Sequence, residues 1–182
     1  SLTLLWDLPS SNGGSGITDY KVEFSSNGGT TWNEIVHDVS AVRSFNVTGL
    51  AKGKSYKFRV SAINVIGTGT ASTVHTVSTL TTVPDVPTAL SSSLMTSSTA
   101  RLSWTAPTDN GGSAITDYTV QTSRDDGTTW TTVAHTASAG TTMNLSGLAP
   151  GTHYLYRVAT KTAVGSSDYV QGELTTLAVV PG

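Results

Sequence analysis

The chain has 182 residues, of which only 12% are charged, and its formal net charge is −2. This composition supplies no basic field for nucleic acid or an anionic membrane surface, and the absence of cysteine excludes disulfides, thiolate zinc sites and a cysteine nucleophile. No apolar run approaches the roughly 18 residues that a membrane span needs. We therefore expect neither nucleic acid nor membrane insertion, and no cofactor.

From one end to the other, the sequence predicts antiparallel β-structure. Short alternating apolar stretches recur every 10 to 15 residues between clusters of Gly, Pro, Asn and Asp, which is typical of a β-sandwich. No segment keeps the 3.6-residue period of a helix. The predicted strands of the first half cover 2–6, 17–25, 32–35, 45–47, 56–62 and 71–80. Those of the second half cover 102–104, 115–123, 130–133, 143–145, 154–158 and 168–174.

The sequence is duplicated in register. Trp6, Tyr20, Trp32, Tyr56 and Gly67 recur as Trp104, Tyr118, Trp130, Tyr154 and Gly165, each 98 positions later (104 − 6 = 98; 165 − 67 = 98). A period of this length corresponds to a whole small domain rather than a solenoid unit. We expect domains at 1–81 and 82–177, with 178–182 as the start of a further linker.

The two copies differ at their beginnings and near their ends. The second copy carries a segment, 83–98, that has no counterpart in the first, so we expect the first domain to lack its opening strand and the chain to belong to a longer array. In the second copy the final Leu174-Thr175-Thr176 arrives about four residues early. This predicts a shorter loop between its last two strands, where the two domains would differ in binding.

The stretches Gly49-Leu50-Ala51-Lys52-Gly53-Lys54-Ser55-Tyr56 and Gly147-Leu148-Ala149-Pro150-Gly151-Thr152-His153-Tyr154 resemble the fibronectin type III family. The resemblance covers nearly the whole chain, twice, and implies two tandem immunoglobulin-like sandwiches. It implies that Tyr56 and Tyr154 form the tyrosine corner and that Trp6 and Trp104 are the core tryptophans. The Asn-Gly-Gly loops at 9–14 and 107–112 are similar to the bacterial style of this domain.

Residues 123–130 match the Asp-box pattern S-x-D-x-G-x-T-W, and residues 25–32 match it with Asn27 in place of the aspartate. The pattern describes a hairpin in which Asp or Asn caps the turn, Gly takes a left-handed conformation and Trp packs beneath. A sialidase propeller would need several copies at a shorter period, together with an arginine cluster. We therefore interpret Trp32 and Trp130 as structural residues.

The sequence contains no catalytic constellation. The four histidines lack a second ligand at metal spacing, and neither a G-x-S-x-G elbow nor an S-x-x-K motif is present. The tripeptide Arg-Gly-Asp is also absent. Asn46 and Asn144 lie in N-x-[ST] sequons, where an outward polar strand residue is the simpler interpretation if the source is bacterial. We predict a protein that is not an enzyme.

The junction at 81–87 carries Pro84 and Pro87, and proline restricts both itself and the residue before it. We expect a stiff linker and a span of roughly 70–80 Å for two domains end to end. The leading hypothesis is a non-catalytic spacer module of a larger secreted or cell-surface bacterial protein, whose partners are neighbouring modules of the same polypeptide.

Two other functions stay open at this stage. One is protein or polysaccharide binding through exposed groups such as Tyr169 and the loop at 123–129, and the other is an accessory role in a polysaccharide-degrading enzyme. The first domain, with one sheet edge unpaired, is also predicted to be the less stable one or to take a strand from another chain, such as the 178–182 tail.

Overall fold

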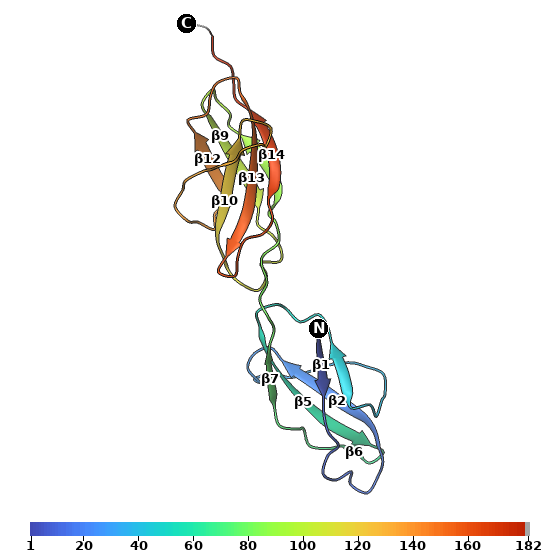
Figure 1. The fold of residues 1–182 in the computed structure, drawn as a ribbon. Coiled ribbons are helices and arrows are strands. Elements are labelled where there is room, and N and C mark those ends of the chain that lie inside the picture. The colour runs from blue at the N-terminus through green and yellow to red at the C-terminus, as the bar shows by residue number, and fades with distance from the viewer. Residues whose placement is uncertain (181–182) are drawn as a thin grey trace. The chain divides into compact units, whose positions relative to one another are not determined.

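The computed structural model describes residues 1–180, and its elements are all β-strands (Figure 1). The chain divides after Leu80 into two compact units, each of which is described by itself. No helix that could cross a membrane occurs in residues 1–180. The predicted further linker at 178–182 lies partly outside the described residues.

In the first unit, the central pair of strands is β2 (Ile17–Ser25) with β5 (Ser55–Asn64). Strand β3 (Asn33–Glu34) pairs with β2, while β6 (Gly67–Thr68) and β7 (His75–Ser78) both pair with β5. The second sheet consists of β1 (Leu2–Leu5) and β4 (Ser44–Val47). Only two residues around the predicted strand at 32–35 pair as a strand.

The second unit repeats this architecture with one more strand. Its larger sheet has the order β11 (Thr131–Thr132), β10 (Ile115–Ser123), β13 (His153–Thr162) and β14 (Val170–Thr175). Its smaller sheet has the order β12 (Thr142–Ser146), β9 (Thr99–Thr105) and β8 (Thr88–Ser93). Strand β8 has no counterpart in the described part of the first unit, so the prediction of two sandwiches with an incomplete first one is confirmed.

Alternation along the central strands places every second residue in the core. Val22 lies opposite Val60 in the first unit, and Val120 lies opposite Val158 in the second. Val120 and Val158 are fully buried, and each burial of this kind stabilises the fold by about 1.5–3 kcal/mol. The intervening residues point to the outer face of the sheet.

A tyrosine hydroxyl closes one end of each unit. Tyr56 accepts a hydrogen bond from the backbone N–H of Ala51 at 3.0 Å, and Tyr154 accepts one from Ala149 at 2.8 Å. Both tyrosine rings are buried. Each hydroxyl therefore satisfies a loop N–H while its ring fills the core.

The strand register corrects one expectation. Tyr56 pairs with Val77 and Tyr154 pairs with Leu174, which are separations of 21 and 20 residues (77 − 56 = 21; 174 − 154 = 20). The prediction of a shorter final loop in the second unit is thus confirmed in direction, but the difference between these paired positions is one residue rather than about four. The Thr-Thr pairs at 81–82 and 175–176 are not equivalent positions, because the equivalent hydrogen bonds to the backbone carbonyls of Ala51 and Ala149 come from Thr79 and Thr176.

The first core is the less completely covered of the two. Leu102 is 0% exposed and Trp104 is 5% exposed, while Leu4 in the position of Leu102 is 8% exposed and Trp6 is half-buried. The extra strand β8 pairs with β9 and lies against β14, and β1 has no such neighbour in the described residues. Since burial of apolar area is the main stabilising term, the first unit should be the weaker one.

We expect two thermal unfolding transitions in the intact chain, the lower one belonging to the first unit. Tyr56→Phe should lower only the first midpoint and Tyr154→Phe only the second, since each leaves one backbone N–H without its partner, at a cost of about 1 kcal/mol. Differential scanning calorimetry of the three proteins measures both midpoints. Two transitions of equal midpoint, or Tyr56→Phe acting on the upper one, would contradict this assignment.

Candidate functional site

The hairpin turn that follows β10 is built around one carboxylate. Asp125 accepts hydrogen bonds from the Ser123 hydroxyl at 2.7 Å, the Thr129 backbone N–H at 2.9 Å and the Thr129 hydroxyl at 2.6 Å. The buried Ser123 hydroxyl also accepts the N–H of Gly127 at 2.9 Å. The polar groups of the Asp-box pattern are therefore engaged with one another and with the turn backbone.

The first unit builds the same turn with an amide. Asn27 accepts from the Ser25 hydroxyl at 2.8 Å and from the Thr31 N–H at 3.0 Å. Its Nδ2 then donates to the Thr31 hydroxyl at 2.8 Å, whereas the second carboxylate oxygen of Asp125 accepts from the corresponding threonine. Asn27 and Asp125 therefore both close their turns, and only the hydrogen bond with the threonine hydroxyl runs in the opposite direction.

The hydrogen bonds to Asp125 favour its charged form. They lower the pKa of this carboxyl from 3.8 to about 2, and the largest cause is the hydrogen bond from the Thr129 hydroxyl. The Thr129 N–H and the Ser123 hydroxyl contribute after it. The shift ties the ionisation of Asp125 to the folding of the turn.

Trp32 and Trp130 lie half-buried beside these turns, each close to the turn glycine at Gly29 or Gly127. Each ring also carries an arginine: the guanidinium of Arg59 lies 4.2 Å from the ring centroid of Trp32, and that of Arg157 lies 4.1 Å from that of Trp130. These cation–π contacts were missed by the sequence reading. The recurrence of Arg59 as Arg157, 98 residues later, marks an equivalent position in the sequence but does not show its contact with the tryptophan.

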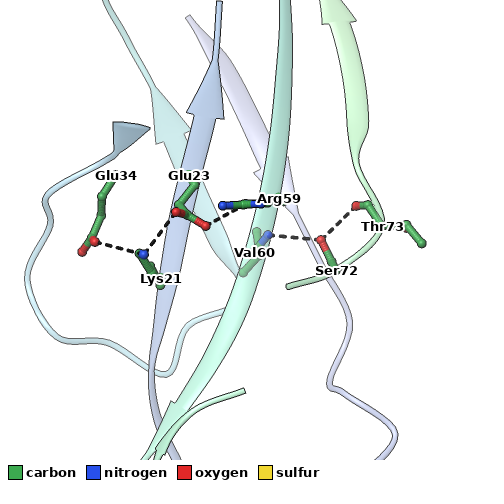
Figure 2. Close-up of polar contacts among 7 residues, drawn as sticks. All are labelled: Lys21, Glu23, Glu34, Arg59, Val60, Ser72 and Thr73. Carbon is green, nitrogen blue, oxygen red and sulfur yellow. Dashed lines mark hydrogen bonds and ion pairs between the residues drawn. The ribbon is translucent and has the colours of Figure 1, made fainter. Parts of the chain in front are cut away.

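In the first unit, charged residues form a neutral cluster around Arg59 on the outer face of the sheet (Figure 2). Its Nε donates to Glu23 at 2.8 Å, and Lys21 lies 3.1 Å from Glu23 and 3.6 Å from Glu34. The Arg59 hydrogen bond is the largest cause that lowers the pKa of Glu23. Two cations and two carboxylates thus balance each other within one patch.

The predicted core tryptophans each meet a tyrosine edge-on. Trp6 lies 5.2 Å from Tyr20 and Trp104 lies 5.1 Å from Tyr118, measured between ring centroids. The indole Nε1 and phenol hydroxyl of both pairs are buried without a hydrogen-bond partner among the described residues. Burial raises the pKa of Tyr118.

In the first unit, the Trp6–Tyr20 pair borders a hollow of about 710 Å³ between the loop at 8–13 and the segment at 63–72. In the second unit, the corresponding loop contains Asp109 and Gly111, and the first residues of that unit cover it. Thr82 donates to the Gly111 carbonyl at 2.9 Å and Asp85 donates to that of Asp109 at 3.0 Å. The start of the second unit therefore fills a place that stays open in the first.

The histidines and carboxylates do not assemble into a metal site in residues 1–180. His37 and His135 occupy equivalent positions, and each contacts the backbone carbonyl of the next residue through Nδ1. Asn46 and Asn144 are exposed. Tyr169, which the sequence singled out as a contact residue, is 40% exposed, and its ring centroid lies 4.3 Å from the guanidinium of Arg157.

Comparison with known proteins places both units in one family. The fibronectin type III domain model matches residues 1–78 and again 85–173, and the chain belongs to this family. A two-domain fibronectin type III segment of chicken tenascin superposes with a TM-score of 0.51 at 24% identity, covering 96% of this chain and 91% of that one. That similarity supports the fold.

Curated relatives come from very different proteins. The chain is 36% identical to chitinase A1 of Niallia circulans over 91% of its length, 33% identical to endoglucanase B of Cellulomonas fimi over 81%, and 30% identical to Drosophila melanogaster titin over 91%. It spans only 22%, 14% and 1% of those proteins. A module of a kind shared among larger proteins is therefore the supported function class.

We expect the second unit to lose stability in acid partly through Asp125. Its folded pKa of about 2 lies below the ordinary 3.8, so its contribution is complete above the ordinary value and is lost as the pH falls towards the folded one. Asp125→Asn, which copies the first unit, should flatten the dependence of the upper unfolding midpoint on pH in this window. Asp126→Asn, which removes the adjacent exposed carboxylate, serves as the control, and an equal effect of both substitutions would refute the assignment.

Proposed function

We propose that the chain is a non-catalytic spacer that links other modules of a larger protein. The observation that carries this proposal is that the motifs which could indicate a binding or catalytic site form the turns and the core in both repeats. Ser123 and Asp125 are bonded within their own turn, and their counterparts in the first unit are bonded likewise. We assign structural roles to the six aromatic residues Trp6, Trp32, Tyr56, Trp104, Trp130 and Tyr154.

The junction supports a spacing role. Leu80 accepts a hydrogen bond from Gly53 at 3.2 Å within the first unit, and Thr82 donates one to Gly111 at 2.9 Å within the second. Thr81 alone stands between these two bonded residues, and Pro84 follows soon after. Because few backbone torsions between Leu80 and Pro84 are left unrestrained, the connection between the domains should be stiff. We propose the domain boundary at 81/82.

We place the parent protein outside a cell, secreted or on a bacterial surface. Support comes from the chitinase and the endoglucanase among the relatives, since polysaccharide substrates of this kind lie outside cells. The accessory role in a polysaccharide-degrading enzyme is the second candidate, favoured by the same two relatives. A catalytic module in the full-length gene would decide between the two roles.

Small-angle scattering tests the stiffness of the junction. We expect a narrow distribution of interdomain distances for the native chain and a broad one after four Gly and Ser residues are inserted between Thr81 and Thr82, because such an insertion is a flexible coil. The insertion variant is the matched control, since both folded units are retained. A native distribution as broad as that of the variant rejects the spacer proposal.

We also propose that the first unit accepts an extended strand from another chain. The outer edge of β1 corresponds to the edge of β9 that β8 occupies, and β1 has no strand there among the described residues. Unpaired edges of this kind are templates for strand addition. The hollow beside Trp6 adds room for the segment that leads into such a strand.

A synthetic peptide with the sequence of residues 82–93 tests this strand addition. Added in excess, it should raise the lower unfolding midpoint and leave the upper one unchanged, because it stabilises only the unit that it binds. A scrambled peptide of the same composition is the control. An unmoved lower midpoint, in a sample that sedimentation shows to be monomeric at all concentrations, rejects the proposal.

A further inference from the structure

On the outer face of the second unit, Arg157 has no counterion among residues 1–180. Arg157 lies on β13 between the buried Tyr156 and Val158, so its side chain points away from the core. Its guanidinium carbon is 4.1 Å from the ring centroid of Trp130 and 4.3 Å from that of Tyr169. We call Trp130, Arg157 and Tyr169 the arginine stack.

Neutral groups hold this guanidinium in place. Arg157 Nε donates to the side-chain oxygen of Gln121 at 2.7 Å, and the amide nitrogen of Gln121 donates to the Thr132 hydroxyl at 3.0 Å. Within residues 1–180, no carboxylate lies within ion-pair distance of Arg157; Glu173, on the neighbouring strand, lies 3.4 Å from His153. The terminal nitrogens Nη1 and Nη2 are therefore available on a preoriented cation.

The first unit shows how the same position looks when its charge is neutralised. Three charged residues of the cluster in Figure 2 have uncharged counterparts 98 positions later in the sequence. These are Gln121 for Glu23, Thr132 for Glu34 and Thr119 for Lys21. Only the arginine is retained, and Ala71 becomes Tyr169. The second unit has thus lost both carboxylates and gained an aromatic ring, which leaves its patch with one net positive charge instead of none.

We propose that the arginine stack binds an acidic polysaccharide, with Arg157 holding the carboxylate of one uronic acid residue. A guanidinium presents two parallel N–H donors that match a carboxylate in a bidentate pair. The ring of Tyr169, 40% exposed, offers an apolar surface to the adjoining sugar. Gln171 lies directly opposite Arg157 on β14 and is exposed, so its amide can donate to and accept from sugar hydroxyls.

The uncharged side chains around Arg157 favour a polysaccharide over an acidic peptide or a nucleic acid. The site offers a single cation flanked by uncharged Gln and Thr side chains, and the whole chain has a net charge of −2. An acidic peptide could place one carboxylate on Arg157, but it would bring no hydroxyls to the surrounding Gln and Thr side chains. Each uronate residue carries one carboxylate together with neutral hydroxyls, so it matches both the cation and its uncharged surroundings. The proposal is independent of the spacing role, so the failure of one leaves the other standing.

Titration of the full chain with trigalacturonate, followed by ¹H–¹⁵N NMR, tests the site. We expect shifts of the Arg157 side chain and the Trp130 indole, with a dissociation constant in the high micromolar to millimolar range, about what one ion pair and one stacked ring supply. The methyl-esterified trisaccharide lacks the charge and should bind about tenfold more weakly. Arg59 and Trp32, in the same spectra, are the internal control and should not move.

Three substitutions separate recognition from simple folding effects. Arg157→Lys keeps the charge but loses the planar fork, Tyr169→Ala restores the residue of the first unit, and Gln121→Glu restores its internal ion pair. Each should weaken trigalacturonate binding about tenfold or more, and urea unfolding verifies that each variant is folded. The matched variant Glu23→Gln changes the first unit and should leave the affinity of the arginine stack unchanged.

Several outcomes would overturn the proposal. These are an absence of shifts up to about 10 mM trigalacturonate, undiminished binding by Gln121→Glu, equal binding of the methyl ester, or shifts centred on Arg59. A hexaglutamate peptide that binds more tightly than trigalacturonate would assign the site to acidic peptides instead. Weakening by all three variants, with the ester and the peptide inferior, supports it.

Discussion

The pairing of the central strands, β2 with β5 and β10 with β13, is the constraint on which the rest of each unit depends. Both pairs show a register irregularity at the same place, between Ile17 and Asp19 and between Ile115 and Asp117. A slip of one residue would move every core side chain to the outer face. The valines at the middle of each pair pack in the core and oppose such a slip. The same register places Arg59 and Arg157, the residues before Val60 and Val158, on the outer face of the sheet.

Strands β2 and β10 were predictable from alternation alone. The predicted strand at 17–25 agrees with β2 and that at 115–123 agrees with β10, because their apolar residues recur at every second position and burial enforces the pattern. The short strands β3 and β11 carry two residues each and hold their place through backbone pairing. Composition says little about such pieces.

The arginine stack could not be derived from the sequence without the register. Trp130, Arg157 and Tyr169 come from three separate segments, and only the pairing of β13 with β10 and β14 brings them onto one face. The length of the last loop could not be predicted from the sequence for a related reason. Thr-Thr pairs occur at several places in a threonine-rich chain, and the hydrogen bonds of Thr79 and Thr176, rather than their neighbours in sequence, identify the equivalent positions.

The two Asp-box turns also bear on the chemical lifetime of the protein. Asn27 is followed by Gly28, the sequence in which an asparagine amide is most open to attack by the next backbone nitrogen, and hydrolysis of that amide would leave a carboxylate. Asp125 shows how an aspartate at this position is accommodated: the Thr129 hydroxyl donates to it, whereas the Thr31 hydroxyl accepts from Asn27. The cyclic imide formed in that attack opens in two ways. The α-aspartyl product would keep the hairpin and acquire the acid sensitivity of the second unit, whereas the β-aspartyl product would insert a methylene into the backbone of the turn.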